Sequence, residues 1–221
     1  MSESLAIDVF WSFRSPWSYL ATGRLRQWQD RYQLDVNFRP VYPIAIRAPD
    51  FFHHVDPLWV SYFITDVVRV AEFLDLPFVW PNPDPVQQAA DEDGKMQTHE
   101  VQPYIYRLTR LGVVAQEQGR GIQFADAVSS LIWGGTLDWY QGDHLAKATA
   151  KAGLDLAEMD EIIVSESDRL EEVIQENQRA HAEAGHWGVP TLRLSGRSLL
   201  RPGSPGCLAL AIAKGRPLDR P

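Results

Sequence analysis

Residues 5–21 read LAIDVFWSFRSPWSYLA, and this stretch decides the expected fold. The run LAIDVFWSF is rich in β-branched and aromatic residues and is too short for a typical helix, so it predicts a buried strand. Ser15 followed by Pro16 is the N-cap and first-turn arrangement that opens a helix, which we expect to reach Tyr32. Residues 34–39 alternate apolar and polar side chains and predict a second strand. The chain therefore begins β-α-β.

The middle of the chain is expected to be mostly helical. Residues 41–56 predict a long loop rich in proline and aromatic residues, and Pro57 begins a helix that continues to about Leu74. The four prolines of residues 76–85 predict a rigid extended connector. Further helices are expected at residues 98–118, 124–133 and 143–152 and along the acidic segment 155–183.

The last part of the chain changes character at Gly188-Val189-Pro190-Thr191. This run precedes strand-like residues and suggests a cis peptide bond between Val189 and Pro190, which usually marks a shaped turn. A loop of this kind leaves the N–H and C=O groups of Val189 free to pair with an extended ligand backbone, although a purely structural turn is the alternative interpretation. A hairpin turning at residues 195–196 and a helix at 202–214 are expected to follow.

The two ends of the chain thus predict β-α-β and β-β-α units. We expect an α/β fold with a thioredoxin-like core and a large helical insertion. Residues 1–41 and 185–221 would form the thioredoxin-like domain, and residues 42–184 the mostly helical insertion domain.

Composition narrows the possible functions. The chain has 221 residues and a formal net charge of −8, which argues against a sequence-independent nucleic-acid binder. A single cysteine, Cys207, excludes an intramolecular disulfide, a CxxC redox pair and a cysteine-based zinc cluster, and we expect it to be a small buried apolar residue. We find no apolar run long enough to span a membrane and no signal sequence before the first strand, so we expect a cytoplasmic protein without a membrane partner.

Ser15 is the first candidate for a chemical role. A hydroxyl at a helix N-cap lies beside unpaired backbone N–H groups and the positive end of the helix dipole, where an anion such as a thiolate is stabilised. The alternative is that Ser15 only caps its own helix.

The motifs together resemble a known family. SPWSYLA at residues 15–21 followed by GVPT at residues 188–191 is similar to the DsbA-like branch of the thioredoxin superfamily. Within that branch, the chain resembles the 2-hydroxychromene-2-carboxylate isomerases and kappa-class glutathione transferases. Further similar stretches are LPFVWP at residues 76–81, LIWGG at residues 131–135 and VYPIAI at residues 41–46.

The resemblance implies specific roles. Ser15 lies where the family serine hydrogen-bonds the sulfur of glutathione and favours its thiolate. Val189, before Pro190, matches the residue whose backbone pairs with the cysteinyl part of glutathione, and Asn82 lies near a polar residue that faces the family's site. In the isomerases the thiolate adds to a conjugated double bond of an aromatic-degradation intermediate, allows rotation and leaves. The resemblance also implies a homodimer and a small aromatic or conjugated substrate.

Two positions depart from the family pattern. After the terminal hairpin these proteins usually carry a Gly-x-Asp-Arg-like turn whose acid helps to hold the γ-glutamyl end of glutathione, whereas residues 203–206 read Gly-Ser-Pro-Gly. Ser204 and the helix N-terminus that follows can still bind the γ-glutamyl carboxylate, but the amino group lacks its usual partner. The second departure is Ser12, where an aspartate is common. A different thiol, or none, is therefore an alternative to glutathione.

These observations define three function classes. The first is an isomerase of the 2-hydroxychromene-2-carboxylate type that uses a bound, glutathione-like thiol. The alternatives are a glutathione transferase-like enzyme and a redox-inert thioredoxin-like module that binds extended peptides. Thiol–disulfide exchange is set aside because Ser15 and Ser18 supply no attacking or resolving sulfur.

Histidine and tryptophan give weaker signals. His53 and His54 are adjacent, so their side chains point apart, and no third ligand has a suitable spacing; we therefore expect no metal site and, at most, a place in the lining of a substrate pocket. We expect His181 and His186 at the surface or at a hinge. The tryptophans near the proposed cleft, which can serve either core packing or an aromatic lining, are Trp11, Trp17, Trp133 and Trp187.

Overall fold

The computed structural model describes residues 5–92, 94–194 and 197–198. Its largest sheet has four strands, in the order β2-β1-β5-β6. The strands are β1 (Ala6–Trp11), β2 (Asp35–Pro40), β5 (Thr191–Leu194) and β6 (Arg197–Ser198).

The pairing of these strands confirms the predicted β-α-β and β-β units. β1 and β2 are parallel, with Ala6 opposite Asp35, and α1 (Pro16–Tyr32) makes the crossover that a parallel pair requires. β5 runs antiparallel to β1, with Phe10 opposite Thr191, and β6 is antiparallel to β5. The helix expected at residues 202–214 lies outside the described residues. The segments at the two ends of the sequence therefore lie side by side in one sheet.

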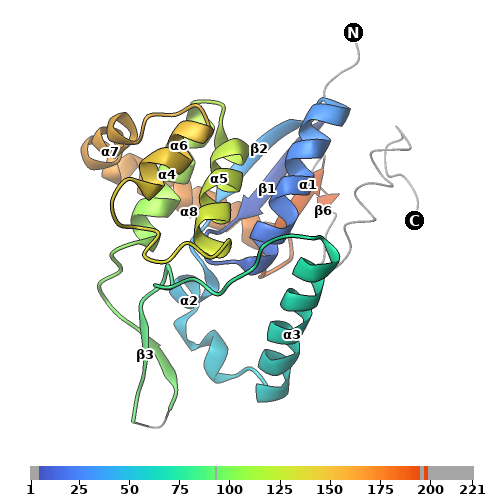
Figure 1. Cartoon of the computed structure of the whole chain (residues 1–221), viewed down its shortest axis with the longest axis vertical. Coiled ribbons are helices and arrows are strands. Elements are labelled where there is room, and N and C mark those ends of the chain that lie inside the picture. The colour runs from blue at the N-terminus through green and yellow to red at the C-terminus, as the bar shows by residue number, and fades with distance from the viewer. Residues whose placement is uncertain (1–4, 93, 195–196, 199–221) are drawn as a thin grey trace.

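Most of the remaining structure is helical, as expected. The helices are α2 (Ile44–Arg47), the 3-10 helix η1 (Pro49–His53), α3 (Pro57–Phe73), α4 (Ile105–Glu117), α5 (Gly121–Trp133), α6 (His144–Lys151), α7 (Leu156–Ser165) and α8 (Ser167–Glu183). Figure 1 shows α4 to α8 gathered beside the sheet, while α3 and the ribbon that contains β3 extend away from it.

Two predicted elements need correction. The helix expected at residues 98–118 begins only at Ile105, and the chain before it forms a two-stranded ribbon of β3 (Gln88–Ala90) and β4 (Met96–Thr98). The acidic segment 155–183 forms two helices instead of one, because the backbone leaves the helical conformation at Glu166, with φ −121° and ψ 27°.

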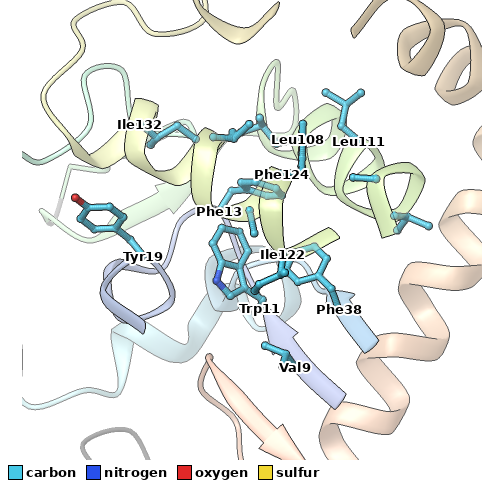
Figure 2. Packing of buried hydrophobic residues seen from close by; sticks show 14 of the residues in the cluster. Val9, Trp11, Phe13, Tyr19, Phe38, Leu108, Leu111, Ile122, Phe124 and Ile132 are labelled. Carbon is cyan, nitrogen blue, oxygen red and sulfur yellow. The ribbon is translucent and has the colours of Figure 1, made fainter. Parts of the chain in front are cut away.

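The two faces of the sheet carry unequal cores. Ile7, Val9 and Trp11 alternate onto one face and join a large cluster with residues of α1, α4 and α5. Figure 2 shows Val9 and Trp11 packed beneath residues of these helices. Phe10 points to the opposite face, where it meets Ala180 of α8 in a much smaller cluster.

Helix α5 approaches β2 very closely at its first residue. A Cβ atom on Gly121 would lie 2.8 Å from the Cβ atom of Phe38, a separation that side chains do not tolerate. The large cluster includes residues from both predicted domains, so the helical segment packs directly on the strands. No helix in the described part of the chain is long and apolar enough to cross a membrane.

Candidate functional site

The turn between β1 and α1 places the Ser15 hydroxyl at a helix N-terminus. Ser15 has an extended backbone, with φ −94° and ψ 116°, and Pro16 follows it at the start of the helix. The Ser15 Oγ atom accepts a hydrogen bond of 3.2 Å from the backbone N–H of Ser18, and the Ser15 N–H donates to the carbonyl of Ser12 at 3.1 Å. The predicted N-cap is thus confirmed, and the hydroxyl lies at the positive end of the helix dipole.

The second predicted motif lies against this turn. The Val189–Pro190 peptide bond is cis, as expected, and Pro190 is buried. The Ser15 hydroxyl donates a hydrogen bond of 3.0 Å to the carbonyl oxygen of Val189, across 174 positions of sequence. Within the described residues, the Val189 N–H donates no hydrogen bond. Ser15 and Val189 are therefore direct neighbours.

The carbonyls just before Val189 are also held by side chains. The Trp187 oxygen accepts from Arg47 Nη2 at 3.0 Å. The Gly188 oxygen accepts from His181 Nε2 at 2.9 Å and from Thr191 Oγ1 at 2.7 Å. Three consecutive carbonyl oxygens thus receive hydrogen bonds from side chains of α2, α8, β5 and the turn before α1.

The expectation that His181 lies at the surface or at a hinge is wrong. Its side chain is 0% exposed, and its ring lies 5.2 Å from the ring of Phe10, measured between centroids. The sequence held a signal for this burial, because Leu170, Ile174 and Asn177 form a buried stripe that reaches His181 after one further turn.

Burial keeps the His181 ring neutral. Desolvation lowers its pKa from 6.5 to about 4, and the charge of Arg47 acts in the same direction. Because a carbonyl oxygen can only accept, the proton of the neutral ring is on Nε2. The Nδ1 atom is then an acceptor, and it is buried without a hydrogen-bond partner among the described residues.

Arg47 is the second residue at this site whose pKa is shifted by burial. Its Nε atom donates to the Tyr42 carbonyl at 2.7 Å, and burial lowers the pKa of the guanidinium. Within the described part of the chain it forms no ion pair with a carboxylate. An anionic group of a ligand would supply the missing counter-charge.

Ser15 and Val189 lie in the wall of a cavity of about 1060 Å³. Arg47 and Ser12 also line it. Much of the remaining wall is aromatic and includes Trp17, Phe51, Trp59, Phe63, Trp133 and Trp187. The expected position near the cleft is thus confirmed for Trp17, Trp133 and Trp187, of which Trp133 also packs in the core, whereas Trp11 is buried in the core and does not line the cavity. The volume and lining suit a small aromatic molecule next to a second ligand.

Ring contacts organise the aromatic wall. Trp59 and Phe63 of α3 stack with their centroids 5.3 Å apart, and Phe63 meets Trp17 of α1 edge-on at 6.1 Å. On the other side, Phe51 lies 4.8 Å from Trp187, which is 50% exposed. The wall thus joins α1, α3 and η1 to the loop before Pro190.

The proline-rich connector crosses the cavity but presents other residues than expected. Asn82 does not line the cavity, and its carbonyl accepts from the backbone N–H of Asp138 at 3.1 Å. Trp80 and Asp84 of the same connector do line the cavity. The carboxylate of Asp84 holds the guanidinium of Arg14 through two hydrogen bonds, of 2.8 and 3.0 Å, and so joins the connector to the Ser15 turn.

The remaining candidates lie elsewhere. His53 and His54 do not line the cavity, although Phe51 and Phe52 just before them do. No group of three or more His, Cys, Asp or Glu side chains that could hold a metal ion occurs among the residues that the structure describes. Ser204 and Cys207 lie outside the described residues.

Solved structures of similar shape come from proteins of several kinds. A structure of 2-hydroxychromene-2-carboxylate isomerase is 20% identical, has a TM-score of 0.70, and the match covers 95% of each chain. A probable DsbA oxidoreductase from Streptomyces coelicolor is 16% identical with a TM-score of 0.65, covering 98% of this chain and 94% of the other. The cytosolic disulfide reductase DsbM from Pseudomonas aeruginosa, solved with GSH, is 17% identical with a TM-score of 0.63, covering 95% and 96%. At these identities the similarity establishes the fold alone.

Sequence comparison identifies the family. No curated protein matches the chain. A profile of the DsbA-like thioredoxin domain, however, matches residues 6–211. That range contains the Ser15 turn, the helical segment and the loop before Pro190. The protein therefore belongs to the DsbA-like thioredoxin domain family and has its thioredoxin-like fold.

Proposed function

We propose that this protein is an isomerase of the 2-hydroxychromene-2-carboxylate type, which uses a bound, glutathione-like thiol to isomerise a small conjugated intermediate of aromatic degradation. The observation that carries the proposal is the 3.0 Å hydrogen bond between Ser15 Oγ and the Val189 carbonyl in the wall of an aromatic cavity. This contact brings together the two groups that a thiol peptide needs, a hydroxyl donor for its sulfur and a backbone edge for its peptide.

Ser15 would favour the ionised form of the bound thiol. Its hydroxyl can donate a hydrogen bond to sulfur, and the N-terminus of α1 places a partial positive charge at the same point. Both effects stabilise a thiolate relative to a thiol and therefore lower the pKa of the bound sulfur. The ligand thiol would supply reversible addition to a conjugated double bond, so that the bond can rotate before the sulfur leaves again.

Val189 would hold the peptide part of the thiol ligand. Its N–H has no acceptor among the described residues, and its carbonyl oxygen accepts from Ser15. When the Ser15 hydroxyl turns to the ligand sulfur, the Val189 oxygen becomes free to accept from a ligand N–H. One internal hydrogen bond is thus exchanged for hydrogen bonds at the sulfur, at the Val189 oxygen and at the Val189 N–H.

The aromatic wall would bind the conjugated substrate. Trp59 and Phe63 offer stacked rings, and Arg47 offers a cation without an ion-pair partner in the described part of the chain. A flat substrate that carries an acidic group fits this combination. Van der Waals contact with the rings would exclude water and keep the conjugated bond near the sulfur.

Two of the similar structures are a probable DsbA oxidoreductase and a disulfide reductase, but for this chain we favour isomerisation over thiol–disulfide exchange. Ser15 and Ser18 occupy the turn, so sulfur must arrive on a ligand. A glutathione transferase-like reaction would use the same thiolate against an electrophilic substrate. A redox-inert peptide binder would use only the backbone of Val189.

Binding and turnover measurements on two variants test the proposal. Ser15→Ala removes the hydroxyl, and Asp155→Ala removes the N-cap of the distant helix α7, so the second variant controls for a lost helix cap. We expect calorimetry to detect glutathione binding and turnover of a chromene carboxylate with the wild type and Asp155→Ala. Ser15→Ala should still bind glutathione but lose most of the turnover. Absence of glutathione binding to the wild type, or full turnover by Ser15→Ala, would contradict the proposal.

A further inference from the structure

The loop before Pro190 receives more side-chain hydrogen bonds than a connecting turn requires. Arg47 holds the Trp187 oxygen, and His181 and Thr191 hold the Gly188 oxygen. The N–H of Gly188 donates to His186 Nδ1 at 2.9 Å. The Trp187 oxygen and both backbone groups of Gly188, just before Val189, are therefore already occupied by the protein.

We propose that His181 is a positioning residue for ligand binding, because its Nε2–H group holds the Gly188 carbonyl and so leaves Val189 as the residue of this loop that pairs with the ligand backbone. This inference rests on the proposed function. An extended peptide can shift along an unoccupied edge, whereas a single available residue permits one register. The fixed register would place the ligand sulfur at Ser15.

The cost of burying His181 supports a role beyond packing. Its side chain is 0% exposed and lies against Phe10, but the Nδ1 atom has no partner in the described part of the chain. A buried acceptor without a hydrogen bond is unfavourable. Leucine would fill a similar space beside Phe10 without that cost. The benefit of histidine at this position is therefore the hydrogen bond that it gives to Gly188.

His181 and Arg47 hold the loop before Pro190 from different elements. His181 comes from the last turn of α8, which packs on the face of the sheet that carries Phe10. Its ring therefore contacts the loop from that face and does not line the cavity. Arg47 reaches the same loop from α2 at the cavity wall. After His181 is removed, the Gly188 carbonyl would keep the hydrogen bond from Thr191 Oγ1, with the His186 Nδ1 atom 3.2 Å away.

Three variants test the inference. His181→Leu keeps the burial and removes the donor, and His181→Gln keeps a donor at a similar reach. Asn177→Ala is the matched control, because Asn177 is a buried residue of the same helix whose Nδ2 atom donates to the Pro40 carbonyl at 3.1 Å, away from the loop. Each protein is measured for glutathione affinity by calorimetry, for hydrogen exchange at the Gly188 amide by NMR, and for stability by chemical denaturation.

We expect His181→Leu to weaken glutathione binding by about tenfold, the equivalent of one good hydrogen bond, without lowering stability. The Gly188 amide should exchange about tenfold faster in His181→Leu, and His181→Gln should restore most of both properties. Asn177→Ala should lose stability but keep wild-type affinity and Gly188 exchange. Wild-type affinity in His181→Leu, or an equal loss of affinity in Asn177→Ala, would overturn the inference.

The exchange measurement separates this inference from the proposed function. If the wild type does not bind glutathione, the proposed function fails. The hydrogen-exchange rate of the Gly188 amide then tests by itself whether His181 positions the loop. Faster exchange in His181→Leu than in Asn177→Ala then supports the positioning role. Equal exchange in the two variants overturns it.

Discussion

The two sides of the candidate site, the Ser15 turn and the loop that ends at Pro190, are held in different ways. The turn depends on neighbours in sequence, since Ser15 bonds to Ser12 and Ser18 and begins its own helix. The loop depends on Arg47, which lies 140 positions from Trp187 in the sequence, and on His181 of the preceding helix α8. A turn of the first kind can be recognised from a short stretch of sequence, whereas a loop of the second kind becomes visible only when the chain is folded.

The two regions also have different roles in the proposed reaction. The turn supplies the reactive environment, a hydroxyl at a helix N-terminus. The loop supplies an edge against which a ligand can align, and side chains from elsewhere fix that edge. Substitutions at the turn should therefore change the pKa of the bound thiol. Substitutions around the loop should change the affinity for the thiol ligand.

The largest effect is expected at the turn itself. Ser15→Ala should lower turnover of a chromene carboxylate by about 100-fold, because both the hydrogen bond to sulfur and its orientation are lost. The lost N-cap should also lower the free energy of unfolding by about 1 kcal/mol. Steady-state kinetics and denaturation measure the two effects. A proportionate loss of turnover and stability in Asp155→Ala would show that capping, and not the hydroxyl at this site, is responsible.

A variant at Trp133 tests whether neighbours in sequence are enough to hold the Ser15 turn. Trp133 of α5 donates from Nε1 to the Phe13 carbonyl at 3.1 Å, just before the turn. Trp133→Phe should lower the free energy of unfolding by about 2 kcal/mol, because a buried carbonyl loses its donor and the ring is smaller. Glutathione affinity should change less than threefold if neighbours in sequence hold Ser15, as is measured by calorimetry. A tenfold loss would show that Trp133 supports ligand binding, through the turn or as part of the cavity wall.

His181 predicts a pH dependence on the loop side. Burial and the charge of Arg47 lower its pKa to about 4 in the folded protein, whereas the unfolded chain has the ordinary value of 6.5. Between these values the unfolded state binds the extra proton, so the contribution of His181 to stability is lost as the pH falls, by at most about 1.4 kcal/mol per pH unit. Denaturation across this range should show a slope in the wild type that His181→Leu lacks. Identical slopes in the two proteins would rule out a buried neutral His181.

The smallest effect is expected at the link between the turn and the connector. Asp84 and Arg14 form an ion pair whose carboxylate side is 44% exposed, so Asp84→Asn should cost about 0.5 kcal/mol of stability. It should also leave the Arg14 charge unopposed near Ser15 and so lower the pKa of a bound thiol further. Raised salt should reduce this second effect. A raised thiol pKa in Asp84→Asn would contradict the electrostatic account of the turn.

Local signals explain how much the sequence could predict. The strand before Arg14, the N-cap at Ser15, the helix that begins at Pro57 and the cis bond at Pro190 each depend on neighbouring residues, and all four are confirmed. The β3–β4 ribbon escapes prediction because each of its strands is only three residues long. Tertiary contacts hold it, such as the hydrogen bond of 3.1 Å from Thr98 Oγ1 to the Ala45 carbonyl.

The sequence predicts the residues of the site that lie in motifs and misses those that do not. Ser15 and Val189 carry motifs, and the structure places them in contact. Arg47 and His181 carry none, since a single cation in a loop and a single histidine on an acidic helix have many possible surroundings. The place of Asn82 after the Phe-Val-Trp-Pro run predicts a residue of the site, but the path of the connector presents Trp80 and Asp84 to the cavity instead. Such choices depend on backbone direction, which spacing alone does not determine.

The most direct test of the account is the ionisation of a bound thiol. Ultraviolet absorbance of the thiolate can be followed against pH for glutathione alone, with the wild type and with Ser15→Ala. We predict that the wild type lowers the thiol pKa by at least about one unit from its ordinary value near 8.5, and that Ser15→Ala abolishes most of this shift. A bound thiol that titrates like free glutathione would contradict the proposal that the Ser15 turn stabilises a sulfur anion.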